Sequence, residues 1–206
     1  MSTNIIESIA SLDKVCEHIN LPIQAGSNSV LYNMRRGYNR DQYLDKIEHI
    51  RNNISNVSLS TDVIIGFCGE SDKDFNETLD IIKSVRFDKV HAAVYSTRPG
   101  TIAARKFDND VPDEVKKERF KALEDLQKQI STEINQGYMN SIQDVLVEEV
   151  EQNRAKGRNR NDKIVHFEGT IDLIGEIVQV KINKTGPWSL QGNKVSKAEL
   201  LVSVGT

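Results

Sequence analysis

The chain has few cysteines and no long apolar run, and both shortages narrow the classes of protein to which it can belong. Cys16 and Cys68 are its two cysteines, and their separation matches no zinc or iron–sulfur ligand spacing. Two buried, reduced thiols are the simplest interpretation of the pair. No apolar segment is long enough to cross a bilayer, and no basic stretch followed by an apolar one opens the chain. We therefore expect no metal ligands, no membrane partner and a cytoplasmic location.

An excess of basic residues is also missing. The 206 residues carry a net charge of −3, with 28% charged and 38% hydrophobic residues. Such a chain has no global attraction to nucleic acid, so any contact with RNA must come from a local patch. The length allows one large domain or two smaller ones.

Three short apolar segments, at about residues 15–23, 57–67 and 89–95, each lead into a polar loop that contains glycine. In the middle one, Val63 to Ile65 show no polar alternation, which is typical of a strand buried on both faces. Helical patterns separate the segments, so the order β-α-β-α-β predicts a parallel sheet with right-handed crossovers. Ligands of such folds bind at the carboxyl ends of the strands. For any one of these loops, an ordinary strand-to-helix turn is the alternative.

Capping residues indicate where the helices begin. Asn39 precedes a helical pattern over residues 40–54, and Ser71 with Asp74 has the spacing of a capping box. A long helix is predicted from Pro112 to about Gly137. Its apolar stripe consists of Phe120, Leu123, Leu126, Ile130 and Ile134.

The character of the chain changes near Tyr138. Four short strand-like segments follow, at about residues 143–150, 163–167, 175–183 and 188–195, separated by Gly and Asn turns. Four or five such strands suit a small all-β barrel of OB-like size. We therefore predict two domains, residues 1–137 and 138–206. Trp188 could stack on a base, although a single Trp in a small barrel more often packs in the core.

A basic segment lies between the first two of these strands. Five cations occur there against Asp162 alone, namely Arg154, Lys156, Arg158, Arg160 and Lys163. As a flexible loop, the segment could follow RNA phosphates, with a salt-dependent affinity. The alternative is a solvated hairpin tip balanced by Glu148, Glu149 and Glu151.

Three of the strand ends carry recognisable motifs. They read Leu-Pro-Ile-Gln-Ala-Gly-Ser at 21–27, Thr-Asp-Val-Ile-Ile-Gly-Phe-Cys-Gly-Glu at 61–70, and Tyr-Ser-Thr-Arg-Pro-Gly-Thr at 95–101. In this order they resemble the radical-SAM methylthiotransferases, and residues 164–167 and 186–192 resemble the TRAM domain that ends the tRNA-modifying members. The resemblance implies an α/β fold: the C-terminal half of a radical-SAM (β/α) TIM-like barrel with its closing helix, followed by an OB-like TRAM β-barrel.

The resemblance also implies a function. Enzymes of this family use S-adenosylmethionine and two [4Fe–4S] clusters to install a methylthio group on carbon 2 of isopentenyladenosine in tRNA. This chain lacks the closely spaced cysteines that hold such clusters, because cluster iron needs thiolate ligands. We therefore expect it to be the C-terminal part of a longer enzyme, inactive alone, with tRNA and the missing N-terminal half as partners. The alternatives are an RNA-binding module without catalysis, and the branches that modify threonylcarbamoyladenosine or a ribosomal protein.

Site residues carried over by motif fall on the three strand ends, and none is assigned as catalytic. The expected cofactor-binding residues are Gln24, Gly26, Ser27, Arg36, Asp62, Ile64 and Gly66. The expected substrate-side residues are Tyr95, Ser96 and Arg98. RNA binding is expected at the five cations of residues 154–163.

Overall fold

The structure is a computed structural model that describes residues 2–195. The chain forms two compact units, one up to Ile130 and the other from Ser131 onward. The expected boundary after residue 137 lies a little further along, and residues 196–206 of the expected second domain lie outside the described residues. No helix within residues 2–195 is both long and apolar enough to cross a membrane.

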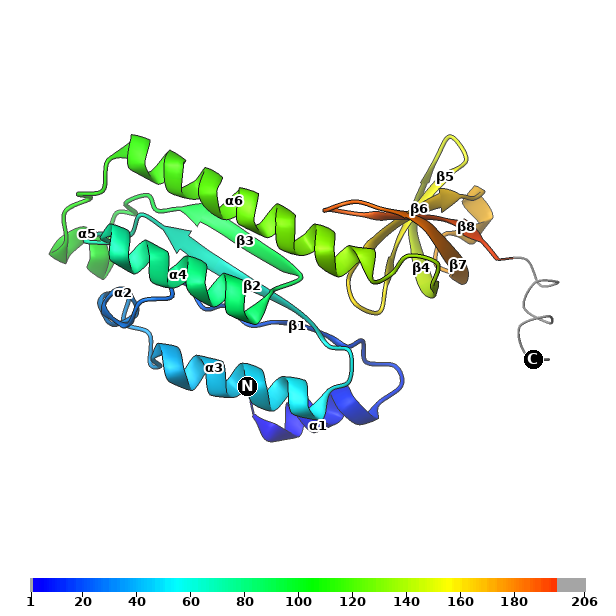
Figure 1. Ribbon diagram of the computed structural model, residues 1–206, viewed down its shortest axis with the longest axis horizontal. Helices are drawn as coiled ribbons and strands as arrows, with labels where there is room; N and C mark the ends of the chain where they lie inside the picture. The colour runs from blue at the N-terminus through cyan, green and yellow to red at the C-terminus, as the bar shows by residue number, and fades with distance from the viewer. Residues whose placement is uncertain (1, 196–206) are drawn as a thin grey trace. The chain divides into compact units, whose positions relative to one another are not determined.

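A parallel sheet forms the centre of the first unit (Figure 1). Its strands are β1 (His18–Asn20), β2 (Ser58–Ile65) and β3 (Lys89–Val94), hydrogen-bonded in that order. The predicted parallel and adjacent arrangement is thus confirmed. The first strand is shorter than predicted because Pro22 has no N–H to donate, and the chain rejoins the sheet only at Gln24, in a single bridge to Val63.

Six helices accompany this sheet, and two of them begin as predicted. Asn39 with Gln42 caps α3, and Ser71 with Asp74 caps α4, each in a reciprocal capping box. The short helices α2 and α5 were not predicted, since neither is long enough to show a helical period. The bounds are α1 (Thr3–Ser11), α2 (Asn28–Asn33), α3 (Arg40–Asn53), α4 (Asp72–Val85), α5 (Ile102–Lys106) and α6 (Asp113–Gln136).

The two faces of the sheet differ in polarity because side chains alternate along a strand. Leu59, Val63 and Ile65 of β2 are buried on one face, where Thr61 lies 3.4 Å from the hydroxyl of Tyr43 on α3. The opposite face carries a hydrogen-bonded row, which we call the polar ladder. It consists of His18, Ser58, Ser60, Asn20 and Asp62, linked at 2.8–3.4 Å.

Helix α6 buries a different stripe from the one predicted. Leu123 and Ile130 are buried as expected, but Phe120 is only half-buried. The buried positions of α6 instead include Lys116 and Arg119. The helix therefore presents charged groups to the interior of the first unit, and apolar spacing alone could not show this.

The second unit is a closed barrel of five strands in the order β4-β5-β6-β8-β7. All neighbours are antiparallel except β6 and β8, which are parallel. Its core is apolar, with Val145, Val165, Val180 and Leu190 fully buried. The bounds are β4 (Ile142–Glu151), β5 (Arg154–Asn159), β6 (Ile164–Glu168), η1 (Ile171–Leu173), β7 (Ile177–Thr185) and β8 (Leu190–Lys194).

The interpretation of the basic segment as a flexible loop was wrong, because its first part is strand β5. The strand was hidden because its buried positions hold Ala155, Gly157 and Asn159, which are not typical strand residues. Gly157 is required there, since a Cβ would lie 2.1 Å from the carbonyl oxygen of Leu146.

Candidate functional site

The carboxyl end of β1 holds the strongest sign of a ligand site in the first unit. Gln24 adopts φ of 73°, a left-handed conformation that costs a non-glycine residue free energy. Its backbone is fixed on both sides, by its N–H to the Asp62 carbonyl at 2.8 Å and by the Ile64 N–H to its own carbonyl at 2.9 Å. The residue as a whole is 9% exposed, and its side-chain amide hydrogen-bonds to no other described residue. A strained backbone that holds an unpaired amide is typical of a binding position.

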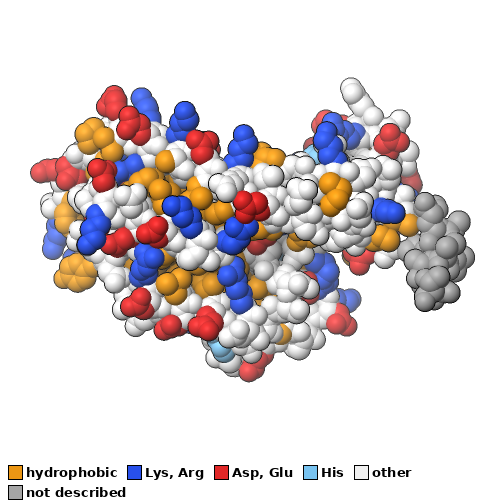
Figure 2. Space-filling view, viewed as in Figure 1, with side chains coloured by type: hydrophobic (Ala, Val, Ile, Leu, Met, Phe, Trp, Pro, Cys, Tyr) orange, Lys and Arg blue, Asp and Glu red, His pale blue; other side chains and the backbone are white. Residues whose placement is uncertain are grey.

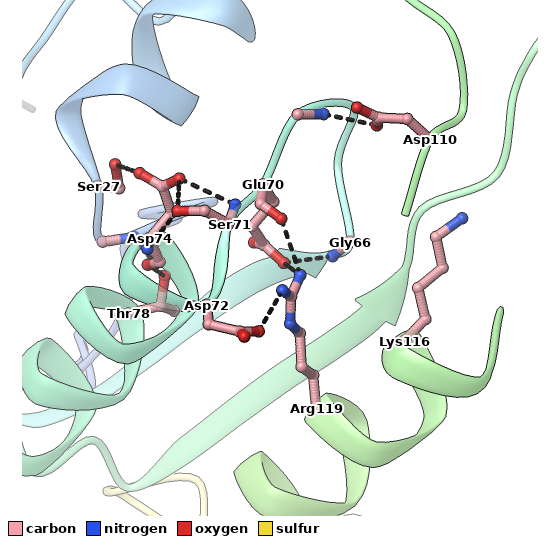
Figure 3. A network of polar contacts seen from close by, with 12 residues as sticks. Ser27, Gly66, Glu70, Ser71, Asp72, Asp74, Thr78, Asp110, Lys116 and Arg119 are labelled. Atoms are coloured by element: carbon pink, nitrogen blue, oxygen red, sulfur yellow. Dashed lines mark hydrogen bonds and ion pairs between the residues drawn. The ribbon is translucent and has the colours of Figure 1, made fainter. Parts of the chain in front are cut away.

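The next two residues of the motif are held by packing against α4 (Figure 3). The N–H of Gly26 donates to Thr78 Oγ1 at 2.8 Å, and a Cβ on Gly26 would lie 2.4 Å from Thr78 Cα. The Ser27 hydroxyl donates a short hydrogen bond to Asp74 Oδ1. The Ser29 hydroxyl donates to the same oxygen at 2.6 Å. Ser71 also bonds Asp74 through its N–H at 2.9 Å and its hydroxyl at 2.5 Å. These bonds hold the pKa of the Asp74 carboxyl well below its usual value.

The end of β2 is held by charged side chains of α6 (Figure 3). The N–H of Gly66 donates to Glu70 Oε2 at 2.8 Å, and Arg119 Nη1 contacts the same oxygen at 2.8 Å. Burial raises the pKa of Glu70 despite these two contacts. Lys116 lies across Gly66, where a Cβ would be 2.4 Å from its Cγ. The ammonium of Lys116 reaches Asn109 Oδ1 at 2.6 Å.

The end of β3 places one predicted residue beside these groups. Tyr95 donates its N–H to the Ile65 carbonyl at 2.8 Å and packs edge-to-face on Phe67, with centroids 4.9 Å apart. The Lys116 ammonium lies 5.9 Å from the Tyr95 ring centroid. Gln24, Gly66 and Tyr95 therefore lie at the carboxyl ends of three hydrogen-bonded strands.

The other predicted residues of this unit lie in more exposed positions. Ser96 and Arg98 are exposed beyond β3, and Arg36 is exposed after α2. Ile64 is half-buried on β2, on the same face as Asp62. The Asp62 carboxylate is engaged in the polar ladder, where it accepts from Asn20 at 3.0 Å.

The described residues do not fit an iron–sulfur cluster, but they do fit an organic ligand. Cys16 is exposed and Cys68 is buried against Phe67, and no group of three His, Cys, Asp or Glu side chains within residues 2–195 is arranged to hold a metal ion. The unpaired amide of Gln24 is the observation that fits a polar ligand such as S-adenosylmethionine at the strand ends.

Sequence reasoning missed Lys116 and Arg119 as parts of this edge. Both are cations, which are almost never fully buried without a partner, so the pattern favoured solvent for them. Their spacing of three on the side of α6 that also carries Leu123 was the one available signal.

In the second unit, most predicted RNA-binding cations are already engaged. Lys156 contacts Glu149 at 2.9 Å, and Arg158 contacts Asp162 at 2.6 Å and Glu148 at 3.2 Å. Lys163 is buried, with its ammonium 5.9 Å from the centroid of the Tyr138 ring, and Arg160 is half-buried. On the face shown in Figure 2, basic and acidic side chains are interspersed rather than segregated. Arg154 differs, because it is exposed and has no ion pair among the described residues.

Trp188 does not pack in the core as a single Trp usually would, since 57% of it is exposed.

Sequence comparisons agree with this division into units. Residues 2–82 match the Radical SAM superfamily, and residues 136–195 match the TRAM domain. In these two regions the chain is similar to a radical-SAM protein that carries a TRAM domain. The chain is 44% identical over 95% of its length to the tRNA-2-methylthio-N(6)-dimethylallyladenosine synthase of Acetivibrio thermocellus, and 45% identical over 95% to that of Clostridium botulinum. The synthase of the same name from Alkaliphilus oremlandii is 42% identical over 96% of the chain. Over nearly its whole length the chain is therefore similar to radical-SAM methylthiotransferases.

The chain spans 41–44% of the length of these relatives.

Proposed function

We propose that this chain works as part of a tRNA methylthiotransferase that installs a methylthio group on carbon 2 of isopentenyladenosine. The observation that carries the proposal is continuous similarity, at 42–45% identity over 95–96% of the chain, to enzymes named for that product. The similarity covers the strand-end motifs and the TRAM region together. The protein-modifying branch would not need a basic barrel segment.

Within this function, the first unit contributes half of a (β/α) TIM-like barrel. Its three parallel strands lie side by side in chain order, as in a barrel wall. We place the domain boundary after residue 137, just beyond the last residue of α6, Gln136.

The strand ends would bind and orient S-adenosylmethionine. We assign this role to Gln24, which has an unpaired side-chain amide, and to the exposed Arg36, whose guanidinium can bind a carboxylate in two contacts. Gly26, Ser27 and Gly66 shape the edge through the packing described above, and Asp62 and Ile64 lie along the adjoining strand. Tyr95, Ser96 and Arg98 would face the RNA substrate. When bound, the cofactor and the two [4Fe–4S] clusters supply the radical chemistry, and the cluster ligands belong to a part of the enzyme other than these residues.

A chimera tests the activity. The part of the Acetivibrio relative that this chain does not match is joined to residues 1–206 and expressed in a bacterium that lacks its own tRNA methylthiotransferase. Nucleosides from its tRNA are then analysed by mass spectrometry. We expect methylthio-isopentenyladenosine, with the intact relative as the positive control and its unmatched part alone as the negative control. If the chimera gave no methylthio-isopentenyladenosine while the intact relative did, the proposal would be refuted.

The second candidate is an RNA-binding module without catalysis, which the absence of cluster ligands among residues 2–195 favours for the chain alone. We expect the isolated chain to show no iron–sulfur absorbance after anaerobic reconstitution, and to retain tRNA on a filter at low salt. A stoichiometric cluster would contradict the assignment of its ligands elsewhere.

A further inference from the structure

Arg40, the first residue of α3, connects the loop after β1 to helix α4. Its Nη1 donates to the Gly26 carbonyl at 3.2 Å and to the Glu77 carbonyl at 2.8 Å. Its backbone N–H donates to Asn28 Oδ1 at 2.7 Å. Arg40 thus contacts the loop at two points and α4 at one, and it is not among the site residues that the strand-end motifs predicted.

The contact needs a charge because two carbonyl groups converge there. Gly26 packs so closely on α4 that a Cβ would lie 2.5 Å from the Glu77 carbonyl oxygen. The carbonyl oxygens of Gly26 and Glu77 both accept from Arg40 Nη1, and they carry like partial charges. A hydrogen bond from an ionised donor is roughly twice as strong as a neutral one, and a guanidinium keeps its charge in proteins. Arg40 therefore stabilises a close approach that the two carbonyls alone would oppose.

The loop that Arg40 holds also carries the strained residue of the strand-end site. Gln24 has φ of 73°, and such a conformation persists only where the surroundings fix it. The backbone bonds to β2 fix Gln24 itself, while Arg40 and Thr78 fix Gly26, which follows in the same loop. If Gly26 were released from α4, the backbone at Gln24 would relax toward an ordinary conformation.

We infer that Arg40 is a positioning residue for S-adenosylmethionine. It does not contact the ligand, and it holds the loop so that Gln24 keeps the conformation in which its amide binds. The inference rests on the proposed function, and it adds to the site a residue from outside the three motifs. Because the guanidinium stays charged at every accessible pH, this support is independent of pH.

A second arginine of α3 provides a matched control. Arg51, in the last turn of the helix, donates from Nη2 to the carbonyl of Val85, the last residue of α4. Both arginines therefore join α3 to α4 through a carbonyl, but among the described contacts it is Arg40 that reaches the loop after β1. Loss of either guanidinium should lower the melting temperature, whereas loss of Arg40 should also weaken ligand binding.

The test uses the chimera described above, with S-adenosylmethionine binding measured by calorimetry after circular dichroism has shown that each variant is folded. Arg40→Met should raise the Kd roughly tenfold, because binding must then impose the strain of one residue again. The KM for S-adenosylmethionine should rise while kcat is unchanged. Arg51→Met should bind like the unsubstituted chimera. Arg40→Lys is a milder change that keeps the charge, and it should raise the Kd less than Arg40→Met does.

A double-mutant cycle tests whether Arg40 acts through Gln24. Glycine adopts the conformation of Gln24 without strain and has no amide, so Arg40→Met should add nothing to the effect of Gln24→Gly on the Kd. Additive effects on the binding free energy, an equal rise of the Kd in Arg51→Met, or unchanged binding by both Arg40 variants would overturn the inference and leave the proposed function standing. If the unsubstituted chimera bound no S-adenosylmethionine, the proposed function would fail as well.

Discussion

Replacement of Arg119 by Met tests whether α6 fixes the end of β2 through a buried charge. Nη1 of Arg119 contacts Glu70 Oε2 at 2.8 Å and the Glu70 carbonyl at 3.1 Å, and the Glu70 side chain is 2% exposed. Without Arg119 the Glu70 carboxylate stays buried, and of the two contacts described above it keeps only the hydrogen bond from the Gly66 N–H. Loss of one member of a buried pair costs about 3–5 kcal/mol, and we expect that loss in Arg119→Met at neutral pH.

The pH dependence identifies the cause. The pKa of Glu70 is raised by burial, and Arg119 works against that rise. Its removal raises the pKa further. A carboxyl whose folded pKa exceeds its unfolded value stabilises the fold at low pH, and this contribution is lost as pH rises through the folded pKa. The defect of the variant should therefore be largest near neutrality and shrink as pH falls toward the ordinary value of 4.5.

Urea unfolding followed by circular dichroism measures the first unit, while fluorescence of Trp188 reports on the second unit and should not change. Glu70→Gln in the Arg119→Met background should restore most of the stability. Asp72 is the other partner of Arg119, and its side chain is 90% exposed. The matched control Asp72→Asn removes this exposed partner and should cost less than about 1 kcal/mol. Equal losses in the two single variants, or a loss in Arg119→Met that does not depend on pH, would refute the reasoning.

Three other substitutions examine the strand ends. Gly26→Ala should destabilise the first unit by about 1–3 kcal/mol in a thermal melt, because its Cβ would meet the backbone of α4, whereas Gly37→Ala, with nothing within 4 Å, should show no steric penalty. Asp74→Asn should reduce the acid sensitivity of unfolding: the lowered pKa of Asp74 stabilises the fold above the ordinary value of 3.8, and that contribution is lost as pH falls. Gln24→Gly should raise the melting temperature, because glycine adopts φ of 73° without strain, while S-adenosylmethionine binding by the chimera, measured by calorimetry, should weaken. If the glycine variant bound S-adenosylmethionine as tightly as the wild type, Gln24 would not be part of the binding site.

Local signals in the sequence predicted the elements that depend on local chemistry. The caps at Asn39 and Ser71 were readable because each involves residues three apart, and the strand ends were readable from apolar runs that stop at glycine. Strand β5 was not readable, since the tight approach at Gly157 is set by a neighbouring strand rather than by its own sequence. The same holds for Lys116, whose burial depends on a glycine fifty positions away along the chain. Contacts between distant segments decide which polar residues become internal.

The polar ladder restricts how the sheet of the first unit can be enclosed. Ser58 is hydrogen-bonded to His18, and Ser60 and Asp62 are both hydrogen-bonded to Asn20. An apolar partner packed on this face would remove water from the remaining lone pairs without replacing its hydrogen bonds. Any enclosure over that surface should therefore stay wet or be filled by a hydrophilic molecule. This face of the sheet is therefore better suited to contact a polar ligand than to pack against apolar side chains of the same protein.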